Sequence, residues 1–475
     1  MIRLFKRYYP VRNIFFIMGE GLLIFLAVTV SATFLKGMDT DQPAFVLYTQ
    51  SFLITFICQI CLYYNTMYDL NALRNNKELI SRLVQALGGA TIILSGIHLW
   101  IGHGIISNPA FILSLLMMVL LVMSWRFIYT LILRCRLFDK TILFVGNSPL
   151  IRSIILEITS RKDSGYHIIH VLPDYDPHIK GENQTIQIKA ACDNYDGLSE
   201  LAKDIGAQLI VSDKDLEGCK GSLEHELLKC RINGVRVMDG NSFFEMITGK
   251  LHVNQISPCW LIFSEGFNRS FLHHTMTIAL DYSLSIFLLL LLMPLILVTA
   301  ILIKLDSRGP VFYSQSRMGK GKKNYNMYKF RTMVWGAEKK SGPLWSKAGD
   351  TRITWIGKYL RNYRIDEIPQ LWNVLKGDMS FVGPRPEREF FVNQLEKSIP
   401  YYGIRFTVKP GITGWAQVNY GYGSTEDDAI EKLNYDLYYI KNSSVLMDIF
   451  IVFKTTKTVI LGVESQTTAP VESMG

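Results

Sequence analysis

Histidine and cysteine are missing from the whole C-terminal part of this 475-residue chain. The last histidine is His274 and the last cysteine is Cys259. An active site built from the region beyond them therefore has no Ser-His-Asp triad, no Cys-His pair and no zinc site. Its nucleophile and proton carriers must be Asp, Glu, Lys, Tyr, Ser or Thr. Any bound metal must be a hard ion with oxygen ligands, and beside phosphates this means Mg²⁺ or Mn²⁺.

Three other patterns are also lacking. The seven cysteines show no spacing typical of disulfides or zinc sites, and Cys58 and Cys61 lie inside an apolar run where core packing is expected. The strand-like TILFVG ends at Gly146, but no G-x-G-x-x-G follows it. A working dinucleotide site is therefore not expected there. No cleavable signal peptide is indicated, because the first apolar run is too long and more such runs follow.

Positive charge is concentrated in one block. The chain has a net charge of +9, yet residues 304–364 contain fifteen Lys or Arg and only three Asp or Glu. The net charge of this block alone exceeds the net charge of the whole chain. It favours a polyanionic partner: nucleic acid, lipid headgroups or a phosphorylated substrate.

Hydrophobic residues make up 49% of the chain, which suggests membrane segments. Four apolar segments of about 20 residues have the length that a bilayer requires. They are Ile14–Leu35, Phe45–Tyr64, Leu83–Ile101 and Pro109–Leu133. Basic residues precede the first segment, fill the 65–82 loop and follow the fourth, so both ends are expected in the cytoplasm. We predict a four-helix transmembrane bundle over residues 1–137, in which Glu20 and Arg126 have structural roles.

Residues 138–250 alternate between strand-like and helix-like stretches. Buried strands are predicted at TILFVG, HIIHVLPDY, AQLIVSD and GVRVMDG, with helices near 149–160, 196–205 and 222–232. This alternation is typical of a parallel, doubly wound sheet, so we predict a Rossmann-like α/β domain. We expect it to serve regulation or assembly, for example as a homodimer contact. Residues 251–274 are expected to be a linker.

A second long apolar segment runs from Met276 to Leu305. A straight crossing would carry the basic block to the outside, against the positive-inside rule. Pro294 lies in its middle and removes one backbone donor, which kinks or breaks a helix. We therefore predict a proline-broken re-entrant membrane helix over residues 275–305. The remaining domains are expected to be a mainly α catalytic domain over 306–462, closed by an interfacial helix over 445–461, and a disordered tail over 463–475.

The most informative stretch is TRITWIGKYLRNYRIDEIPQLWNVLKGDMSFVGPRPE, which begins at residue 351. It places the adjacent carboxylates Asp366 and Glu367 after two arginines and before Pro369, where Asp366 is predicted to be a helix N-cap. A carboxylate can attack phosphorus, and cations can hold the phosphate oxygens. Four cations are candidates for phosphate binding: Lys329 and Arg331, expected to point the same way from one strand, with Arg361 and Arg385.

From about Thr275 to Gly462 the sequence resembles the bacterial sugar transferase family, the monotopic phosphoglycosyl transferases. The matching pieces are the helix broken at Pro294, RGPVFYSQSRMG, YKFRTM, the stretch just quoted, KPGITGWAQVN and YDLYYIKN. The four spans and the degenerate nucleotide fold in front resemble the large members that prime capsule, O-antigen or exopolysaccharide synthesis. Met293 departs from the family's serine before the proline.

The resemblance implies a two-step reaction at the cytoplasmic face of the bacterial inner membrane. Asp366 would attack the β-phosphate of a UDP-hexose, releasing UMP, and undecaprenyl phosphate would then accept the sugar phosphate. Glu367 would hold Mg²⁺. Asp378 and Asp436 match acids of the family, and Asp378 is a further candidate metal ligand. Lys329, Arg331, Arg361 and Arg385 would bind phosphates.

Three other functions fit the sequence less well. A membrane-bound nucleotide-sugar dehydratase would need the glycine-rich turn and a Tyr-x-x-x-Lys, and residues 138–250 contain neither. A non-catalytic lipid-binding scaffold would not depend on Asp366. Nucleic-acid binding has little support beyond charge, so no nucleic-acid partner is expected.

Overall fold

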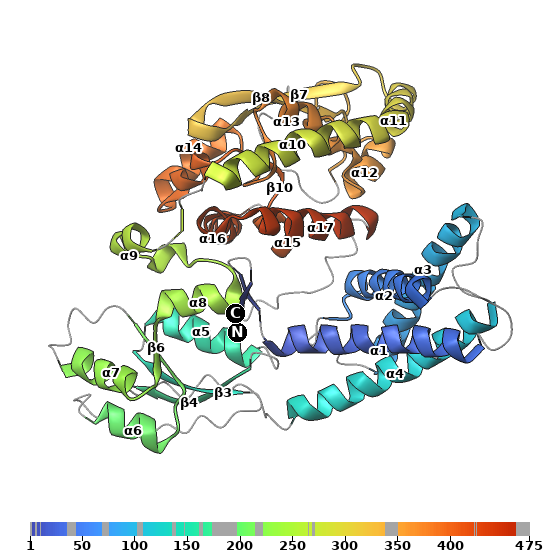
Figure 1. Cartoon of the computed structure of the whole chain (residues 1–475). Helices are drawn as coiled ribbons and strands as arrows, with labels where there is room; N and C mark the ends of the chain where they lie inside the picture. Colours follow the sequence, from blue (N-terminus) through green and yellow to red (C-terminus); the bar gives the residue numbers. More distant parts are fainter. Residues whose placement is uncertain are drawn as a thin grey trace. The chain divides into compact units, whose positions relative to one another are not determined.

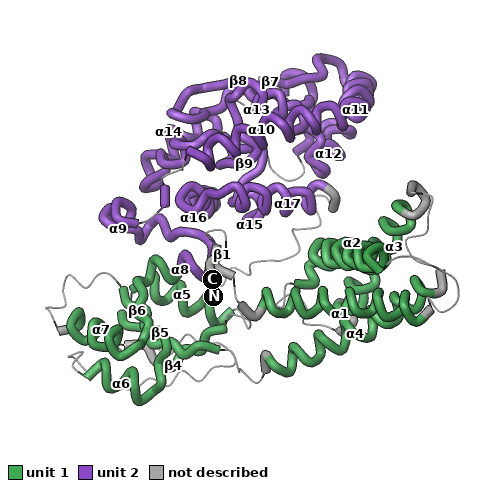
Figure 2. The backbone as a smooth tube through the Cα atoms, viewed as in Figure 1, with its two compact units in different colours: residues 1–3, 8–243 green, residues 4–7, 244–475 purple. Residues whose placement is uncertain are grey.

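The structure is a computed structural model. It describes residues 2–4, 7–9, 11–35, 44–68, 76–101, 108–134, 139–146, 148–160, 165–172, 197–213, 222–264, 266–267, 271–337, 350–421, 423 and 425–461. The chain divides into two compact units, residues 1–3 with 8–243 and residues 4–7 with 244–475 (Figure 2). Two short strands, β1 (Ile2–Leu4) and β2 (Arg7–Tyr9), lie near the N-terminus. The predicted disordered tail over 463–475 lies outside the described residues.

Four long apolar helices open the first unit (Figure 1). They are α1 (Val11–Leu35), α2 (Ala44–Tyr64), α3 (Asn76–Ile101) and α4 (Asn108–Arg134). Each contains a stretch of 19 to 23 residues that is long and apolar enough to cross a membrane. Ile24, Cys58, Leu87 and Met118, one from each helix, belong to one buried core. The predicted lengths of the four spans are confirmed.

Two buried charged residues inside these helices, Glu20 and Arg126, pair with each other. The guanidinium of Arg126 on α4 lies 2.7 Å from the carboxylate of Glu20 on α1, and both side chains are buried. Arg126 also donates to the carbonyl of Met67 at 2.8 Å. A charge in an apolar bundle is costly unless it is paired, and here the pair joins α1 to α4. This geometry accords with the structural roles predicted for both residues.

The rest of the first unit is an α/β sheet. Its strands are β3 (Lys140–Val145), β4 (Tyr166–Leu172), β5 (Leu209–Ser212) and β6 (Arg236–Asp239). They are parallel in the order β4-β3-β5-β6. Helices α6 (Leu198–Asp204) and α7 (Ser222–Ile232) cover one face (Figure 1). Helix α5 (Pro149–Ser160) and the start of α8 (Gly240–Thr248), up to Phe243, cover the other. The predicted doubly wound, Rossmann-like fold is confirmed.

The segment expected to be a linker, residues 251–274, packs as part of the second unit. It contains the 3₁₀ turn η3 (Val253–Gln255) and helix α9 (Pro258–Phe263). Leu251, Val253 and Trp260 are buried in the same core as Leu437 of helix α16 (Glu426–Asn442). The division between the two units falls between Phe243 and Phe244. The apolar side chains in this segment explain the difference, because burying them requires contact with the following domain.

The long apolar segment is two helices. α10 (Phe271–Leu291) and α11 (Met293–Asp306) are separated at Leu292. Pro294 occupies the first turn of α11 and has no N–H to give to the preceding turn, so the first helix ends here. The break predicted at Pro294 is present. Buried Asp281 of α10 accepts hydrogen bonds from Ser380 Oγ at 3.1 Å and from the backbone N–H of Phe381 at 2.8 Å.

Short strands and helices form the remainder of the second unit. β7 (Phe312–Met318) and β8 (Asn324–Phe330) are antiparallel around η4 (Lys320–Lys322), and β9 (Ser380–Val382) pairs in parallel with β10 (Gly411–Thr413). The helical elements are α12 (Trp355–Asn362), η5 (Ile365–Glu367), α13 (Gln370–Lys376), α14 (Glu389–Ser398), η6 (Tyr402–Thr407), α15 (Trp415–Asn419), α16 (Glu426–Asn442) and α17 (Val445–Leu461). The mainly α content predicted for this region is confirmed.

The last helix, predicted to be interfacial, packs into the core of the second unit along one side. Met447 and Ile451 are buried there, and Asp448 accepts a hydrogen bond from Tyr439 at 2.8 Å. Leu446 and Ile449 remain exposed. Lys454 of the same helix donates to Asn419 Oδ1 at 3.0 Å, so two charged residues of the helix are held in contacts within the protein.

Candidate active site

Strand β8 supplies the first cation of the site. Lys329 lies opposite Tyr313 in the β7–β8 pair. Asn373 of α13 holds the edge of β8 that is not paired with β7. Its side chain accepts from the N–H of Tyr328 at 3.0 Å and donates to the carbonyl of Asn326 at 2.7 Å. Because Asn373 follows the acidic pair by six residues, this bond fixes Lys329 relative to the two carboxylates.

The two carboxylates lie in the 3₁₀ turn η5, directly before α13. Both Asp366 and Glu367 are buried. The prediction that Asp366 is the N-cap of the helix is wrong: Pro369 holds that position, and no side chain caps the helix. Arg364, which precedes the turn, has a left-handed backbone with φ of 54°. Such a conformation is uncommon for a residue with a side chain, and it directs the chain into the turn.

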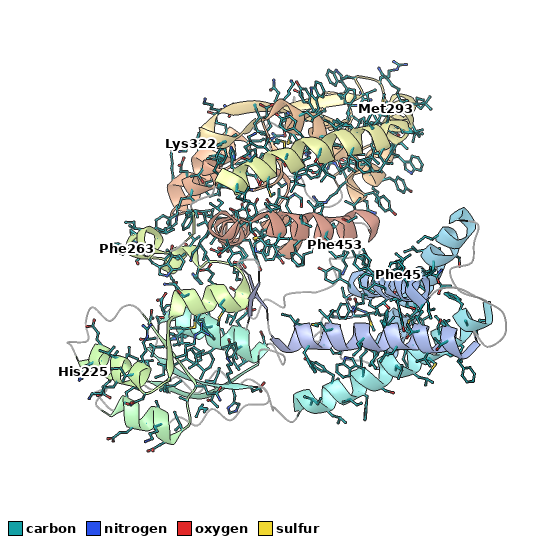
Figure 3. All side chains as sticks on the ribbon, viewed as in Figure 1. Phe45, His225, Phe263, Met293, Lys322 and Phe453 are labelled. Carbon is teal, nitrogen blue, oxygen red and sulfur yellow. The ribbon has the colours of Figure 1, made fainter. Side chains whose placement is uncertain are left out.

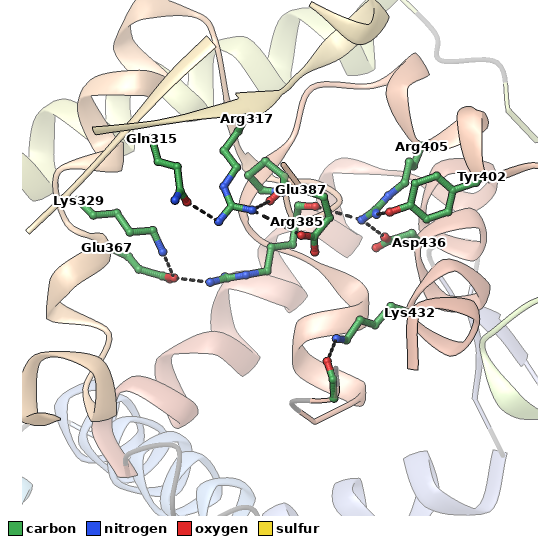
Figure 4. A network of polar contacts seen from close by, with 12 residues as sticks. Gln315, Arg317, Lys329, Glu367, Arg385, Glu387, Tyr402, Arg405, Lys432 and Asp436 are labelled. Carbon is green, nitrogen blue, oxygen red and sulfur yellow. Dashed lines mark hydrogen bonds and ion pairs between the residues drawn. The ribbon is translucent and has the colours of Figure 1, made fainter. Parts of the chain in front are cut away.

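Glu367 is the centre of a cation cluster (Figure 4). Its Oε1 accepts from Lys329 Nζ at 3.1 Å and from Arg385 Nη2 at 2.8 Å. Its Oε2 lies 3.5 Å from Arg364 Nη1. Lys329, Arg364 and Arg385 come from three separate segments, so tertiary folding is needed to assemble the cluster. Three cations around one carboxylate leave a net positive site, as binding of a diphosphate requires.

The two adjacent carboxylates have opposite pKa shifts. Burial raises the pKa of Asp366 to about 6, against the opposing positive charge of Lys329, with Glu367 adding to the rise. Burial also acts to raise the pKa of Glu367, but the charges of Arg385, Lys329 and Arg364 outweigh it, so this pKa is lowered. Glu367 is therefore ionised at neutral pH, whereas Asp366 titrates close to neutral pH.

Arg361 joins the site from α12. Its Nε donates to Thr332 Oγ1 at 2.9 Å, which holds the side chain beside the β8 end of the site. Its positive charge acts to lower the pKa of Asp366, as do those of Lys329 and Arg385. Of the four predicted phosphate-binding cations, three are thus assembled around the acidic pair.

Arg331 is placed elsewhere. Strand β8 ends at Phe330, so Lys329 and Arg331 do not project from one strand as expected. The buried Arg331 guanidinium donates to the carbonyls of Ser307 at 2.7 Å and Arg308 at 2.9 Å, near the C-terminal end of α11. Arginine there satisfies carbonyls that lack partners in the helix. A phosphate-binding role for Arg331 stays a prediction without support from this geometry.

Asp378 and Asp436, the two further candidates, are held by other side chains. Asp378 Oδ2 lies 3.5 Å from Asn373 Nδ2, and Asp436 Oδ2 accepts from Arg405 Nη2 at 2.9 Å. Burial raises the pKa of Asp436 to about 6, although Arg405 opposes the rise. One site residue escaped the sequence-based candidates: Arg364, whose position three residues before Glu367 was the available signal.

The acidic pair suits a hard divalent metal in part. Within the described residues, no group of three or more His, Cys, Asp or Glu side chains could hold a metal ion. Mg²⁺ is commonly bound through one or two carboxylates, with substrate phosphate oxygens and water completing its coordination. Asp366 and Glu367 fit that donor set, provided that a phosphorylated substrate supplies the rest.

Known proteins share this part of the chain. A model of the bacterial sugar transferase family matches residues 272–462. A Rhizobium leguminosarum exopolysaccharide production protein PSS is 42% identical over 182 residues, which are 37% of this chain and 91% of that protein. This chain belongs to the bacterial sugar transferase family. The family region contains the acidic pair and every cation of the cluster.

Larger relatives match over a smaller share of their length. A UDP-N-acetylgalactosamine-undecaprenyl-phosphate N-acetylgalactosaminephosphotransferase of Aeromonas hydrophila is 40% identical over 272 residues, which are 54% of this chain and 61% of that protein. An undecaprenyl-phosphate glucose phosphotransferase of Komagataeibacter xylinus is 42% identical over 184 residues, 38% of this chain and 35% of that protein. The chain thus spans less than two thirds of the length of either relative.

Proposed function

We propose that this protein transfers a hexose 1-phosphate from a UDP-hexose to undecaprenyl phosphate and releases UMP. The observation that carries the proposal is the buried Asp366–Glu367 pair within a cluster of cations. The names of the relatives support the substrate classes, because they specify undecaprenyl phosphate and either N-acetylgalactosamine or glucose. This reaction would be the first membrane step in making exopolysaccharide, capsule or O-antigen.

The proposed mechanism has two displacements at one phosphorus atom. A carboxylate oxygen of Asp366 attacks the β-phosphorus of the sugar nucleotide, and the bond from that phosphorus to the oxygen bridging the α-phosphate breaks. UMP leaves with the bridging oxygen, and the sugar phosphate stays on Asp366 as an acyl phosphate. A phosphate oxygen of undecaprenyl phosphate then attacks the same phosphorus and breaks its bond to Asp366. The carboxylate is regenerated.

The cations of the site stabilise the charge on the phosphates in both steps. Lys329 and Arg385 contact Glu367, and Arg385 is the more exposed of the two. A diphosphate entering the site would compete with Glu367 for their N–H donors, because phosphate oxygens accept the same bonds. In the protein without substrate, Glu367 thus accepts the hydrogen bonds that a substrate phosphate would accept from these cations. Arg361 adds positive charge on the Asp366 side.

Mg²⁺ is the proposed cofactor. Glu367, with Asp366 beside it, would contribute the protein oxygens that hold it. When bound, the ion would neutralise phosphate charge as UMP departs. The protein's own contribution is to keep both carboxylates buried and to surround them with fixed cations.

The membrane helix would place this site at the bilayer surface. Around the break, α10 and α11 expose apolar side chains, including Leu290 and Leu297. Met293, labelled in Figure 3, is also exposed. Yet Asp281 of α10 bonds to β9, and the end of α11 bonds to Arg331 after β8, so both arms contact one catalytic unit. A helix pair that dips into the cytoplasmic leaflet of the inner membrane and returns satisfies both observations. The phosphate of undecaprenyl phosphate lies at the same depth.

UMP release tests the proposed function. Purified full-length protein in detergent would receive Mg²⁺, undecaprenyl phosphate and a panel of UDP-sugars headed by N-acetylgalactosamine, glucose and galactose. We expect UMP release with at least one of them. Asp366→Asn keeps the size of the side chain and removes the nucleophile, so it should abolish release.

Two results would contradict the proposal. Release at the normal rate by Asp366→Asn would exclude attack by this carboxylate. Absence of release from every UDP-sugar, by protein that unfolds cooperatively on heating, would leave a lipid-binding scaffold as the better account. Lys322→Gln, which alters an exposed ion pair with Glu396, is the matched control and should release UMP normally.

A further inference from the structure

The turn that carries Arg385 is held by every one of its carbonyl groups. Arg385 lies between Pro384 and Pro386, and neither proline has an N–H to anchor the turn. The carbonyls of four consecutive residues accept hydrogen bonds: Pro384 from Gly411 N at 3.0 Å, Arg385 from Arg405 Nη2 at 3.0 Å, Pro386 from Arg317 Nη1 at 3.2 Å and Glu387 from Met318 N at 3.0 Å. Two of the four donors are arginine side chains.

Arg405 makes this contact from a buried position. It lies in η6 and is buried together with its two side-chain partners (Figure 4). Nη2 donates to Asp436 Oδ2 at 2.9 Å as well as to the carbonyl of Arg385, and Nη1 donates to Tyr402 Oη at 2.5 Å. Burying an ion pair costs desolvation energy, and a hydrophobic pair of the same size is often as stable. The fork geometry of the guanidinium is what an apolar side chain could not replace.

Arg317 holds the next carbonyl from the opposite side. It lies on β7, where Nη2 donates to Gln315 Oε1 at 2.7 Å. Nη1 donates to the carbonyl of Pro386 and lies 3.5 Å from Glu387 Oε2. Each of these two arginines thus has an acidic partner of its own, Glu387 for Arg317 and Asp436 for Arg405. In each arginine the nitrogen that contacts the acid also donates to the backbone of the turn: Nη2 of Arg405 and Nη1 of Arg317.

The geometry points to Arg405 and Arg317 as positioning residues for Arg385, with Asp436 orienting Arg405. The two guanidiniums fix the backbone of the turn, so the Arg385 side chain is presented 2.8 Å from Glu367. This assigns Asp436 a role away from the metal and the reacting atoms. The inference rests on the proposed phosphate-binding role of Arg385.

A double-mutant cycle on UMP release tests this assignment. Arg405→Lys and Arg317→Lys would each be made in the full chain, alone and together with Arg385→Lys. A lysine keeps the charge but cannot donate to a carboxylate and a carbonyl in a fixed fork. We expect each single variant to lose roughly 10- to 100-fold in kcat/KM, the loss typical of one charge-assisted hydrogen bond. Added to Arg385→Lys, either change should cost much less, because the two act through one group.

Strict additivity in the cycles would overturn the proposal, since a purely structural effect would add to that of Arg385→Lys. Wild-type kinetics in both single variants would also overturn it. If Arg405→Lys no longer unfolds cooperatively, the Arg317→Lys cycle decides alone, because that residue enters through a different carbonyl. Lys322→Gln again serves as the control. If the wild-type protein releases no UMP, the proposed function has failed, an outcome distinct from additive cycles in an active protein.

Discussion

At the scale of single residues, the chemistry depends on how one environment shifts the pKa values of two neighbouring carboxylates in opposite directions. Glu367 has three cationic partners and keeps its negative charge, whereas Asp366 is buried beside that charge. Pairs of titratable groups whose pKa values are driven apart often have distinct catalytic roles. Here the division favours Glu367 as the fixed anion and Asp366 as the more basic nucleophile.

The pH dependence of UMP release should report the state of Asp366. With its pKa raised to about 6 by burial, the carboxyl is mostly protonated below pH 6 and mostly ionised above pH 7. Only the carboxylate attacks phosphorus, so kcat/KM should fall about tenfold per pH unit below the midpoint. Lys329→Gln removes a charge that lowers this pKa, so the midpoint should rise. A pH profile flat down to pH 4.5 would exclude a titrating nucleophile of this kind.

Glu367→Gln should have the opposite effect on that midpoint. The negative charge of Glu367 raises the pKa of Asp366, and its removal frees positive charge to stabilise the Asp366 carboxylate. We expect the midpoint of the acid limb to move below pH 6. The rate at neutral pH should fall by roughly 100-fold, because fixed charges around the phosphates are displaced. Unchanged Mg²⁺ dependence and an unchanged rate in this variant would mean that Glu367 has no role in metal binding or in the reaction.

At the scale of elements, the proposed position of the site at the membrane surface depends on the break between α10 and α11. Pro294 ends one helix, and Asp281 and Arg331 secure the two arms to the catalytic unit. If the two helices dip into the membrane and return, as proposed, the basic residues after α11 stay on the side where the positive-inside rule places them.

Thiol labelling measures this topology. In a variant with all seven native cysteines replaced, Lys320→Cys should react with a membrane-impermeant reagent only after the inner membrane is permeabilised. Asp39→Cys, in the loop expected outside, is the control and should react in intact spheroplasts. Labelling of Lys320→Cys without permeabilisation would show a full crossing and contradict the dipping helix pair.

At the scale of the whole molecule, the family match and the folding unit begin at different residues. The match begins at residue 272, but the second unit begins at Phe244, because buried side chains before α10 complete its core. The Rhizobium relative, 91% of which is covered by a 182-residue match, shows that some members consist of little beyond the family region. We therefore expect the proposed reaction to need only the second unit.

Two truncations test where the catalytic unit starts. A chain starting at Phe244 should fold in detergent and release UMP. One starting at Thr275 lacks Leu251, Val253 and Trp260, and removing large side chains from a core costs about 2–5 kcal/mol each. It should therefore unfold at a much lower temperature or fail to fold. Equal thermal stability of the two truncations would mean that residues 251–274 are a linker after all.

The sequence alone predicted features that depend on local patterns. Apolar length determined the four spans, strand–helix alternation the parallel sheet, and Pro294 the helix break, and all three are present. What depends on tertiary contacts was less accessible. Arg331 looks equivalent to Lys329 in sequence but satisfies carbonyls near the end of α11, and Arg405 gave no local sign that it holds the Arg385 turn.

The central claim is a covalent sugar phosphate on Asp366, and intact-protein mass spectrometry measures it most directly. Incubation with Mg²⁺ and the accepted UDP-hexose, without undecaprenyl phosphate, should increase the protein's mass by the difference between that nucleotide sugar and UMP. The adduct should be absent from Asp366→Asn and should disappear when undecaprenyl phosphate is added. UMP release at full rate from acceptor-containing samples, with no adduct trapped at any time and normal turnover by Asp366→Asn, would contradict the account.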